Sequence, residues 1–202
     1  MTTLDLSAYP VDAINWKPDQ SIKQRRNAGG RFRGAGTGPM FYNPSVDIAA
    51  LPYQQAREFE AHIEGFEGAT TPFDLILPLV CTPSGQAKNV LESAVTVTAN
   101  NGKTLSTTGW PINTQSLFKA GDLIRLNSLS KTYKIAAPVN SNGSGQADIV
   151  LTRPLLAPAI NGENIIFNPV RLSVTQTSPA QKYDIPGNKQ SAFELDFQEV
   201  VL

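Results

Sequence analysis

The sequence predicts a mainly β protein: a β-barrel or β-sandwich outer domain that carries one α-helix, plus an inserted small β module. Short runs that alternate apolar and polar residues recur from residue 73 onward, which is typical of strands. Only residues 52–65 have the apolar spacing of a helix. Gly and Pro occupy 15 positions each, and residues of these two types interrupt long regular elements.

Residues 1–45 are expected to be largely irregular. They contain four prolines and a glycine-rich stretch over residues 29–38. Proline lacks the N–H that a central strand donates, and glycine weakens the interior of a strand. We therefore expect only short extended pieces in this part of the chain, near residues 13–16 and 40–42.

Residues 52–65 are predicted to form the helix. Pro52 suits the first helical position, where a missing N–H costs nothing, and Gly65 supplies the stop. Apolar residues follow one another at spacings of three, four and three, and therefore share one face: Ala56, Phe59, Ile63 and Phe66.

The rest of the chain is predicted to be a succession of short strands. Two of them are separated by a short polar loop and predict a hairpin. The last strand has the clearest alternation, with Phe193, Leu195 and Phe197 on one face and polar residues on the other. The predicted strands lie at residues 73–77, 95–98, 122–126, 131–135, 147–152, 164–167, 170–174 and 193–198.

Two breaks divide the predicted strands into two groups. Residues 83–90 are polar and rich in turn formers, and Asn168 precedes a proline at the second break. The segment between the breaks has strands and turns of its own. The sequence therefore predicts an outer domain of residues 1–84 and 167–202, with residues 85–166 inserted as a small β-barrel module.

The composition excludes several classes of protein. The chain carries 17 basic and 17 acidic side chains, and this neutrality argues against a dedicated duplex-DNA binder. One cysteine and one histidine exclude an intrachain disulfide and a zinc site built from several Cys or His, so no metal or cofactor is predicted. No signal peptide or membrane span is evident, and we expect a soluble chain made in a reducing cytoplasm. A charged fraction of only 17% favours a subunit whose surface is covered by partners.

No arrangement of residues predicts an enzyme. His62 lies on the predicted helix with no nucleophile motif nearby, and Cys81 sits in an apolar segment that favours an inert thiol. Glu194 and Asp196 share one strand face, but any alternating strand with an acidic wet face places carboxylates in this way. The glycines of residues 34–38 lack the Lys and Ser or Thr of a phosphate-binding loop.

A basic, glycine-rich arm and an acidic helix region predict an assembly surface. Six basic residues lie between Trp16 and Gly36 against one acid, whereas residues 57–74 carry five acids against one arginine. Opposite charges on separate segments favour docking within the fold or between copies of the chain. Single-stranded nucleic acid is the alternative partner of an Arg- and Gly-rich arm. The predicted interface comprises Trp16, Lys23, Arg25, Arg26, Arg31, Arg33, Glu58, Glu60 and Glu64.

Several segments also follow one another in a recognisable order. They are Trp-Lys-Pro at 16–18, the helix at 56–68 running into Pro-Phe-Asp-Leu-Ile-Leu-Pro at 72–78, Gly-Trp-Pro at 109–111, Leu-Phe-Lys-Ala-Gly-Asp-Leu-Ile at 117–124, Tyr-Lys-Ile at 133–135, the strand segment 145–156 and the final strand at 193–199. This succession covers most of the chain and resembles the distal tail (tail hub) proteins of tailed bacteriophages.

The resemblance implies a structural protein of the virion. Such a protein forms a ring, usually six-fold, at the end of the tail tube, and is assembled in the host cytoplasm. The outer domain would be a split β-barrel that joins the sheets of its neighbours around a central channel, and DNA would pass through as cargo. The polar face of residues 193–198 would suit the channel lining. The partners implied are the chain itself, the tail-tube protein and other tail-tip, baseplate or fibre proteins, with no membrane.

The inserted module supports a second hypothesis, an adhesin that binds a carbohydrate or another receptor. Trp110 and Tyr133 are the candidate stacking platforms for such a ligand. The alternative for Trp110, which lies between a glycine and a proline, is that its ring closes a small β core. A third hypothesis is binding of single-stranded nucleic acid through the basic arm.

Overall fold

The computed structural model describes residues 2–26, 32–66, 70–177, 182–183 and 190–201, and these form a mainly β protein, as predicted. The large sheet has the strand order β1-β4-β11-β13-β3-β2, and β12 pairs with β13 beside it. Its strands are β1 (Thr3–Asp5), β2 (Val11–Arg26), β3 (Phe32–Pro52), β4 (Phe73–Ile76), β11 (Leu172–Gln176), β12 (Lys182–Tyr183) and β13 (Gln190–Glu199).

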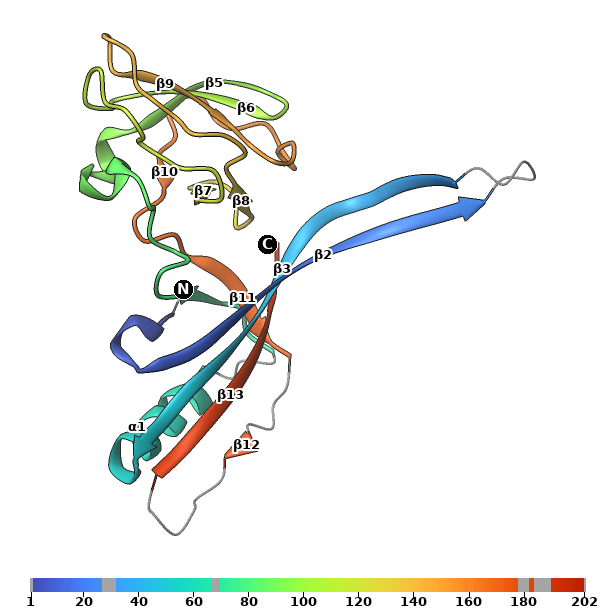
Figure 1. Cartoon of the computed structure of the whole chain (residues 1–202), viewed down its shortest axis with the longest axis vertical. Helices are drawn as coiled ribbons and strands as arrows, with labels where there is room; N and C mark the ends of the chain where they lie inside the picture. The colour runs from blue at the N-terminus through green and yellow to red at the C-terminus, as the bar shows by residue number, and fades with distance from the viewer. Residues whose placement is uncertain (1, 27–31, 67–69, 178–181, 184–189, 202) are drawn as a thin grey trace.

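Two smaller sheets make up the upper part of the molecule in Figure 1. The first, in the order β10-β7-β8, contains β7 (Leu123–Leu126), β8 (Thr132–Lys134) and β10 (Ile165–Ile166). The second, in the order β5-β6-β9, contains β5 (Thr96–Asn101), β6 (Thr104–Thr108) and β9 (Gln146–Val150). Short 3-10 helices lie at η1 (Leu6–Ala8), η2 (Gln86–Asn89) and η3 (Glu92–Ala94).

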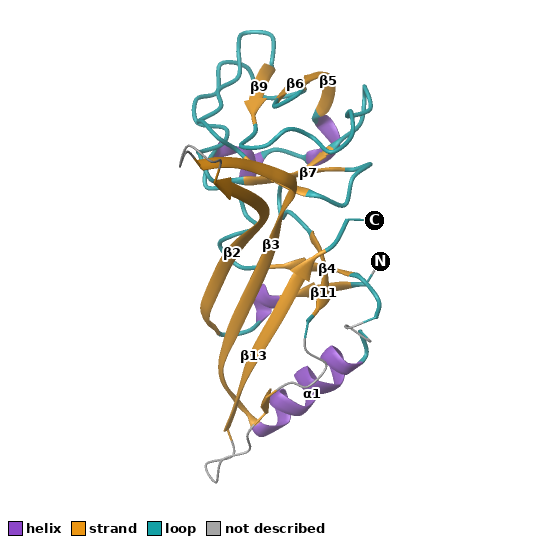
Figure 2. Ribbon diagram, turned by 90° about the vertical axis from the view of Figure 1, so that its right-hand side faces the viewer, coloured by secondary structure: helices purple, strands orange, loops and turns teal. Residues whose placement is uncertain are grey.

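The helix is confirmed, and it covers part of the large sheet. α1 (Tyr53–Glu64) begins directly after β3, with Pro52 as its N-cap residue and Gly65 as its C-cap residue. Its apolar face is buried, as the spacing predicts. Figure 2 shows the helix running beside the lower half of β13, where the Phe59 ring meets Phe193 edge-on at 4.9 Å between centroids.

The expectation that residues 1–45 are mostly irregular is wrong. β2 and β3 form one long antiparallel ribbon whose register runs from Val11 opposite Ile48 to Arg26 opposite Phe32. The prolines are tolerated because the strands have unpaired edges: β2 lies at the edge of the sheet, and β13 pairs with β3 only as far as Ser45. Pro18 therefore lies in an edge strand, and Pro44 lies where β2 is the only described strand that pairs with β3.

The buried apolar side chains form two separate clusters. The first contains residues of α1, β3, β4, β11 and β13, together with Leu123 of β7. The second is formed by residues between 87 and 167. The predicted boundaries of the inserted module at residues 85 and 166 thus fall close to the division between the clusters, with Leu123 and Phe167 as the exceptions.

The remaining strands largely follow the sequence pattern. The predicted hairpin at 122–126 and 131–135 is present as β7 and β8, which pair antiparallel. In β13, Phe193, Leu195 and Phe197 are buried, and the polar residues between them are exposed. The short strands β1, β6 and β12 were not predicted, since two or three residues carry too little periodicity and the Thr- and Ser-rich β6 has a single clearly apolar residue.

Candidate functional site

The ribbon formed by β2 and β3 projects from the body of the molecule. β3 is 21 residues long, but β13 accompanies it only between Pro52 and Ser45. Beyond that point the two strands of the ribbon pair with each other and with no other described strand. Figure 1 shows this distal part extending to the right and upward, on the side away from α1. An isolated two-stranded ribbon is marginally stable in water, and open strand edges are templates for pairing with another chain.

The predicted basic residues gather near the far end of the ribbon. The backbone register places Arg25 opposite Arg33, with Lys23 and Arg26 on the same stretch of β2. Arg31 lies outside the described residues. Four of the five arginines and lysines named for the arm therefore belong to the part of the ribbon that pairs with no further strand among the described residues.

The predicted acidic partners lie far from this end. Glu58 and Glu64 are exposed and Glu60 is half-buried on α1, and the helix is at the lower end of the molecule in Figure 1, away from the tip of the ribbon. Within one chain the helix glutamates and the basic stretch of β2 are therefore separate.

Trp16 lies at the root of the ribbon, apart from the basic residues near its end. Its half-buried ring packs against the first apolar cluster and stands 4.7 Å from the Tyr42 ring, centroid to centroid. Trp16 and Tyr42 come from facing strands, and such aromatic pairs stabilise a sheet. We conclude that Trp16 anchors the ribbon to the body, where it can fix the direction in which the ribbon leaves.

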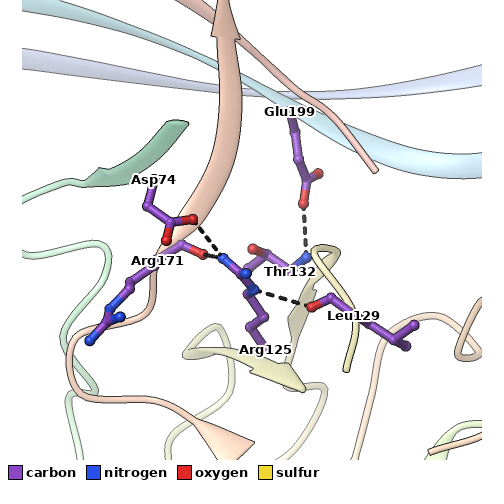
Figure 3. A network of polar contacts seen from close by, with 6 residues as sticks. All are labelled: Asp74, Arg125, Leu129, Thr132, Arg171 and Glu199. Atoms are coloured by element: carbon purple, nitrogen blue, oxygen red, sulfur yellow. Dashed lines mark hydrogen bonds and ion pairs between the residues drawn. The ribbon is translucent and has the colours of Figure 1, made fainter. Parts of the chain in front are cut away.

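A buried carboxylate joins three elements at the same root. Glu199, at the end of β13, is 2% exposed. It accepts hydrogen bonds from the backbone N–H of Tyr42 at 3.0 Å and from that of Thr132 at 2.8 Å, and it forms an ion pair with the ammonium group of Lys131. Figure 3 shows the side chain reaching from β13 to β8. One carboxylate thus ties the large sheet and the ribbon to the small β10-β7-β8 sheet.

Lys131 is almost as buried as its partner, at 4% exposed. Its ammonium group lies 4.7 Å from the centre of the Tyr42 ring, which adds a cation–π contact to the ion pair. Burial lowers the pKa of Lys131, and the Glu199 carboxylate acts in the opposite direction. Burial also raises the pKa of the Tyr42 hydroxyl, which stays protonated at neutral pH.

A second polar contact holds the small sheets against the large one. The Arg125 guanidinium on β7 forms an ion pair with Asp74 on β4 at 2.9 Å and donates to the carbonyl oxygen of Arg171 at 2.9 Å. It also donates to the carbonyl oxygen of Leu129 at 3.1 Å (Figure 3). Two separate polar contacts, those of Glu199 and of Arg125, thus join the module to the large sheet.

The prediction that Trp110 and Tyr133 are stacking platforms is wrong, because each ring is only 4% exposed. The Trp110 ring packs in the second cluster, 5.4 Å from Phe118 and 5.2 Å from Phe167 between centroids. The Tyr133 hydroxyl accepts a hydrogen bond from the Leu156 N–H at 3.0 Å. Neither ring presents a face to a ligand, and Trp110 has the core role that the sequence offered as its alternative.

The residues considered for catalysis remain apart. His62 is exposed on α1 beside Phe66, and Glu194 and Asp196 are exposed on the outer face of β13. The described residues contain no cluster of His, Cys, Asp and Glu that could hold a metal ion. In the same part of the chain, no helix is both long and apolar enough to cross a membrane.

Cys81 is expected to resist thiol reagents in the folded protein. The side chain is 1% exposed, and burial raises the pKa of the thiol to about 12. Because the thiolate is the reactive form, a disulfide reagent at pH 8 should label the unfolded chain at least tenfold faster than the folded chain. Labelling with and without denaturant measures this ratio, and equal rates would mean that the region around Cys81 opens readily.

The sequence matches no protein-family model, and no curated protein matches it significantly.

Proposed function

We propose that this protein is a structural subunit of a bacteriophage tail tip, and that copies of it form a closed hub ring, with six copies as the expected number, through the β2–β3 ribbon. The observation that carries the proposal is the distal ribbon, whose strand edges have no partner among the described strands. A neighbouring copy would supply the missing contacts. The assignment to a phage tail follows from the resemblance in segment order.

The distribution of charge supports a ring. A closed ring requires a heterologous interface, in which one patch of a copy meets a different patch of the next. The ribbon carries the basic residues, and α1, at the opposite end, carries Glu58, Glu60 and Glu64. Each copy therefore has one positively charged and one negatively charged surface, and these surfaces can meet head to tail.

The outer face of the large sheet suits the lining of a channel for DNA. Glu194 and Asp196 are exposed on β13, and the register places Asp47 of β3 opposite Glu194 on one side and Lys182 of β12 opposite it on the other. Like charges at such a position destabilise a sheet, but they repel a passing polyanion and prevent it from adhering. In the ring, DNA would pass as cargo along this face.

The module of the small sheets would lie outside the ring, where it could attach further components of the tail. Its partners would be fibre or baseplate proteins, and the ring itself would join the tail-tube protein. The polar contacts of Glu199 and Arg125 would hold the module in a constant orientation relative to the ring.

Charge reversal tests the interface directly. The double variant Arg25→Glu and Arg26→Glu should weaken assembly at least tenfold, since like charges placed across an interface oppose association. Light scattering after size-exclusion chromatography measures the assembled fraction against protein concentration and salt. The matched control reverses Lys88 and Lys103, which are exposed on the module, and should assemble normally. Assembly unchanged by the Arg25 and Arg26 reversal would eliminate the ribbon as the interface.

Compensating reversal on the helix makes the test more specific. Adding Glu58→Lys and Glu60→Lys to the ribbon variant should restore assembly, because the signs of both surfaces are then exchanged. If the helix substitutions fail to restore a ring that the ribbon substitutions have weakened, the ribbon docks on another surface of the neighbouring copy.

A further inference from the structure

The module carries an open polar depression of about 610 Å³ on the β5-β6-β9 sheet, beside the turn that precedes β9. The strands contribute Thr98, Ser106 and Asp148, and the turn contributes Asn140 and Asn142. The volume lies within the range of small-ligand sites. The depression is separate from the ribbon and from α1, so nothing in the proposed ring accounts for it.

The amide groups of the depression have fixed orientations. The Asn140 Oδ1 accepts from the backbone N–H of Ser116 at 2.7 Å, and the Asn142 Oδ1 accepts from the backbone N–H groups of Ser144 and Gln146, both at 2.9 Å. A backbone N–H can only donate, so each amide must direct its oxygen toward these N–H groups. The amide nitrogens are thereby left to donate elsewhere, and that of Asn142 donates to the Gln146 Oε1 at 3.2 Å.

The same logic applies to Gln146 and extends to the acceptors. Because the Gln146 oxygen is occupied, its amide nitrogen remains a donor, as does that of Asn140. The Asp148 Oδ1 accepts from the Ser106 hydroxyl at 2.7 Å, and the second oxygen of this carboxylate remains as an acceptor among the described contacts. Thr98 lies at a β-bulge, an irregularity that often turns a side chain toward a site.

The chemistry of the lining selects a class of ligand. The described residues that line the depression include no Lys, Arg or His, and Asp148 is a carboxylate, so an anionic ligand is disfavoured. Ala147 and the methyl groups of threonine are the apolar elements of the lining, which disfavours an apolar ligand. Fixed amide donors beside a carboxylate acceptor suit neighbouring hydroxyl groups, because each hydroxyl both donates and accepts.

We propose that this depression binds a neutral saccharide. With no aromatic ring among the lining residues, hydrogen bonds supply the affinity, and one site should bind with a Kd on the order of 1 mM, or about −4 kcal/mol. Weak single sites become effective when several copies act together. Binding at one site does not depend on the ring, so it can be tested whether or not the proposed assembly is correct.

The test uses the full-length chain and neutral trisaccharides of glucose, galactose and N-acetylglucosamine as probes. Saturation-transfer NMR detects millimolar binding, and titration gives the Kd. Asp148→Asn retains the acceptor for Ser106 but makes one carboxylate oxygen an amide nitrogen, and Gln146→Glu replaces an amide donor by an acceptor. Each should weaken binding about tenfold. Asn101→Ala, an exposed residue of β5 outside the depression, should have no effect.

The outcomes separate the proposal from its rivals. Unchanged thermal unfolding of the variants establishes that they fold. Binding of a neutral trisaccharide that both substitutions weaken supports the site. No binding by any of the neutral probes, binding that neither substitution changes, or stronger binding of a sulfated trisaccharide than of its neutral parent would overturn it.

Discussion

Replacing Glu199 by alanine is expected to lower the free energy of unfolding by about 3–5 kcal/mol, because it breaks a buried ion pair from one side. The Lys131 ammonium would then be left without its counter-charge in a site where it is 4% exposed. The backbone N–H groups of Tyr42 and Thr132 would also lose their acceptor. An unsatisfied buried group adds to the loss.

Denaturant unfolding followed by tryptophan fluorescence and circular dichroism measures this loss. Glu194→Ala is the matched control, since Glu194 lies on the same strand but is exposed, and it should change the free energy by less than about 1 kcal/mol. Lys131→Met combined with Glu199→Gln should recover much of the stability, because removing both charges leaves no unpaired ion. Equal losses for Glu199→Ala and Glu194→Ala would show that the buried contact contributes nothing.

Shortening the ribbon is expected to abolish assembly and leave the folded chain intact. Gln20 of β2 and Met40 of β3 are partners in the register, so an Asn-Gly turn can replace residues 21–39 and close the hairpin there. Beyond Gln20 and Met40 the two strands pair with each other and with no other described strand, so the deletion leaves the described pairing of the large sheet unchanged. The shortened chain should therefore unfold with native cooperativity, yet remain a monomer in light scattering.

The control for this deletion changes a turn that the proposed interface does not use. Replacing Gly102 and Lys103, between β5 and β6, by Asn-Gly retains a two-residue hairpin turn and should leave assembly unchanged. If the shortened chain still forms assemblies with the same number of copies as the native chain, the interface lies elsewhere on the molecule.

The sequence predicted the elements in which the spacing of apolar residues reflects the burial of one face. Apolar residues recur every three or four positions in the helix at 53–64 and at every second position in the final strand, because one face of each is buried in the first cluster. The ribbon escaped prediction because a proline excludes a strand only where a neighbour requires its N–H. Whether a strand has one neighbour or two depends on distant segments of the chain, so the residue pattern of the strand alone cannot predict it.

The junction at Glu199 could have been anticipated in part. Glu199 falls in phase with Phe193, Leu195 and Phe197 and therefore belongs to the buried face, whereas Glu194 and Asp196 belong to the exposed face. A carboxylate in that phase requires a buried donor or cation. That cation is Lys131, which lies 68 residues away in the sequence. Its place beside Glu199 follows only from the docking of the module on the sheet.

For Trp110 the error is that a ring proposed as an exposed stacking platform is buried. The sequence offered Trp110 as a stacking platform or as a ring that closes a small β core, and in the structure the backbone N–H of Trp110 donates to the carbonyl oxygen of Gly145 at 3.1 Å. A Cβ at Gly145, whose φ is +69°, would lie 2.5 Å from the Trp110 carbonyl oxygen. Glycine here permits two backbone segments to approach closely, and the approach carries the ring into the core.

The central claim is that copies of this chain close into a ring through the ribbon. Electron cryo-microscopy of the purified full-length protein, alone and mixed with the tail-tube protein proposed as its partner, tests that claim most directly. Class averages should show closed rings with a central channel and the small-sheet module on the outside, and the chain with the shortened ribbon should give none. Single particles with the mass of one chain under both conditions would contradict the proposed function.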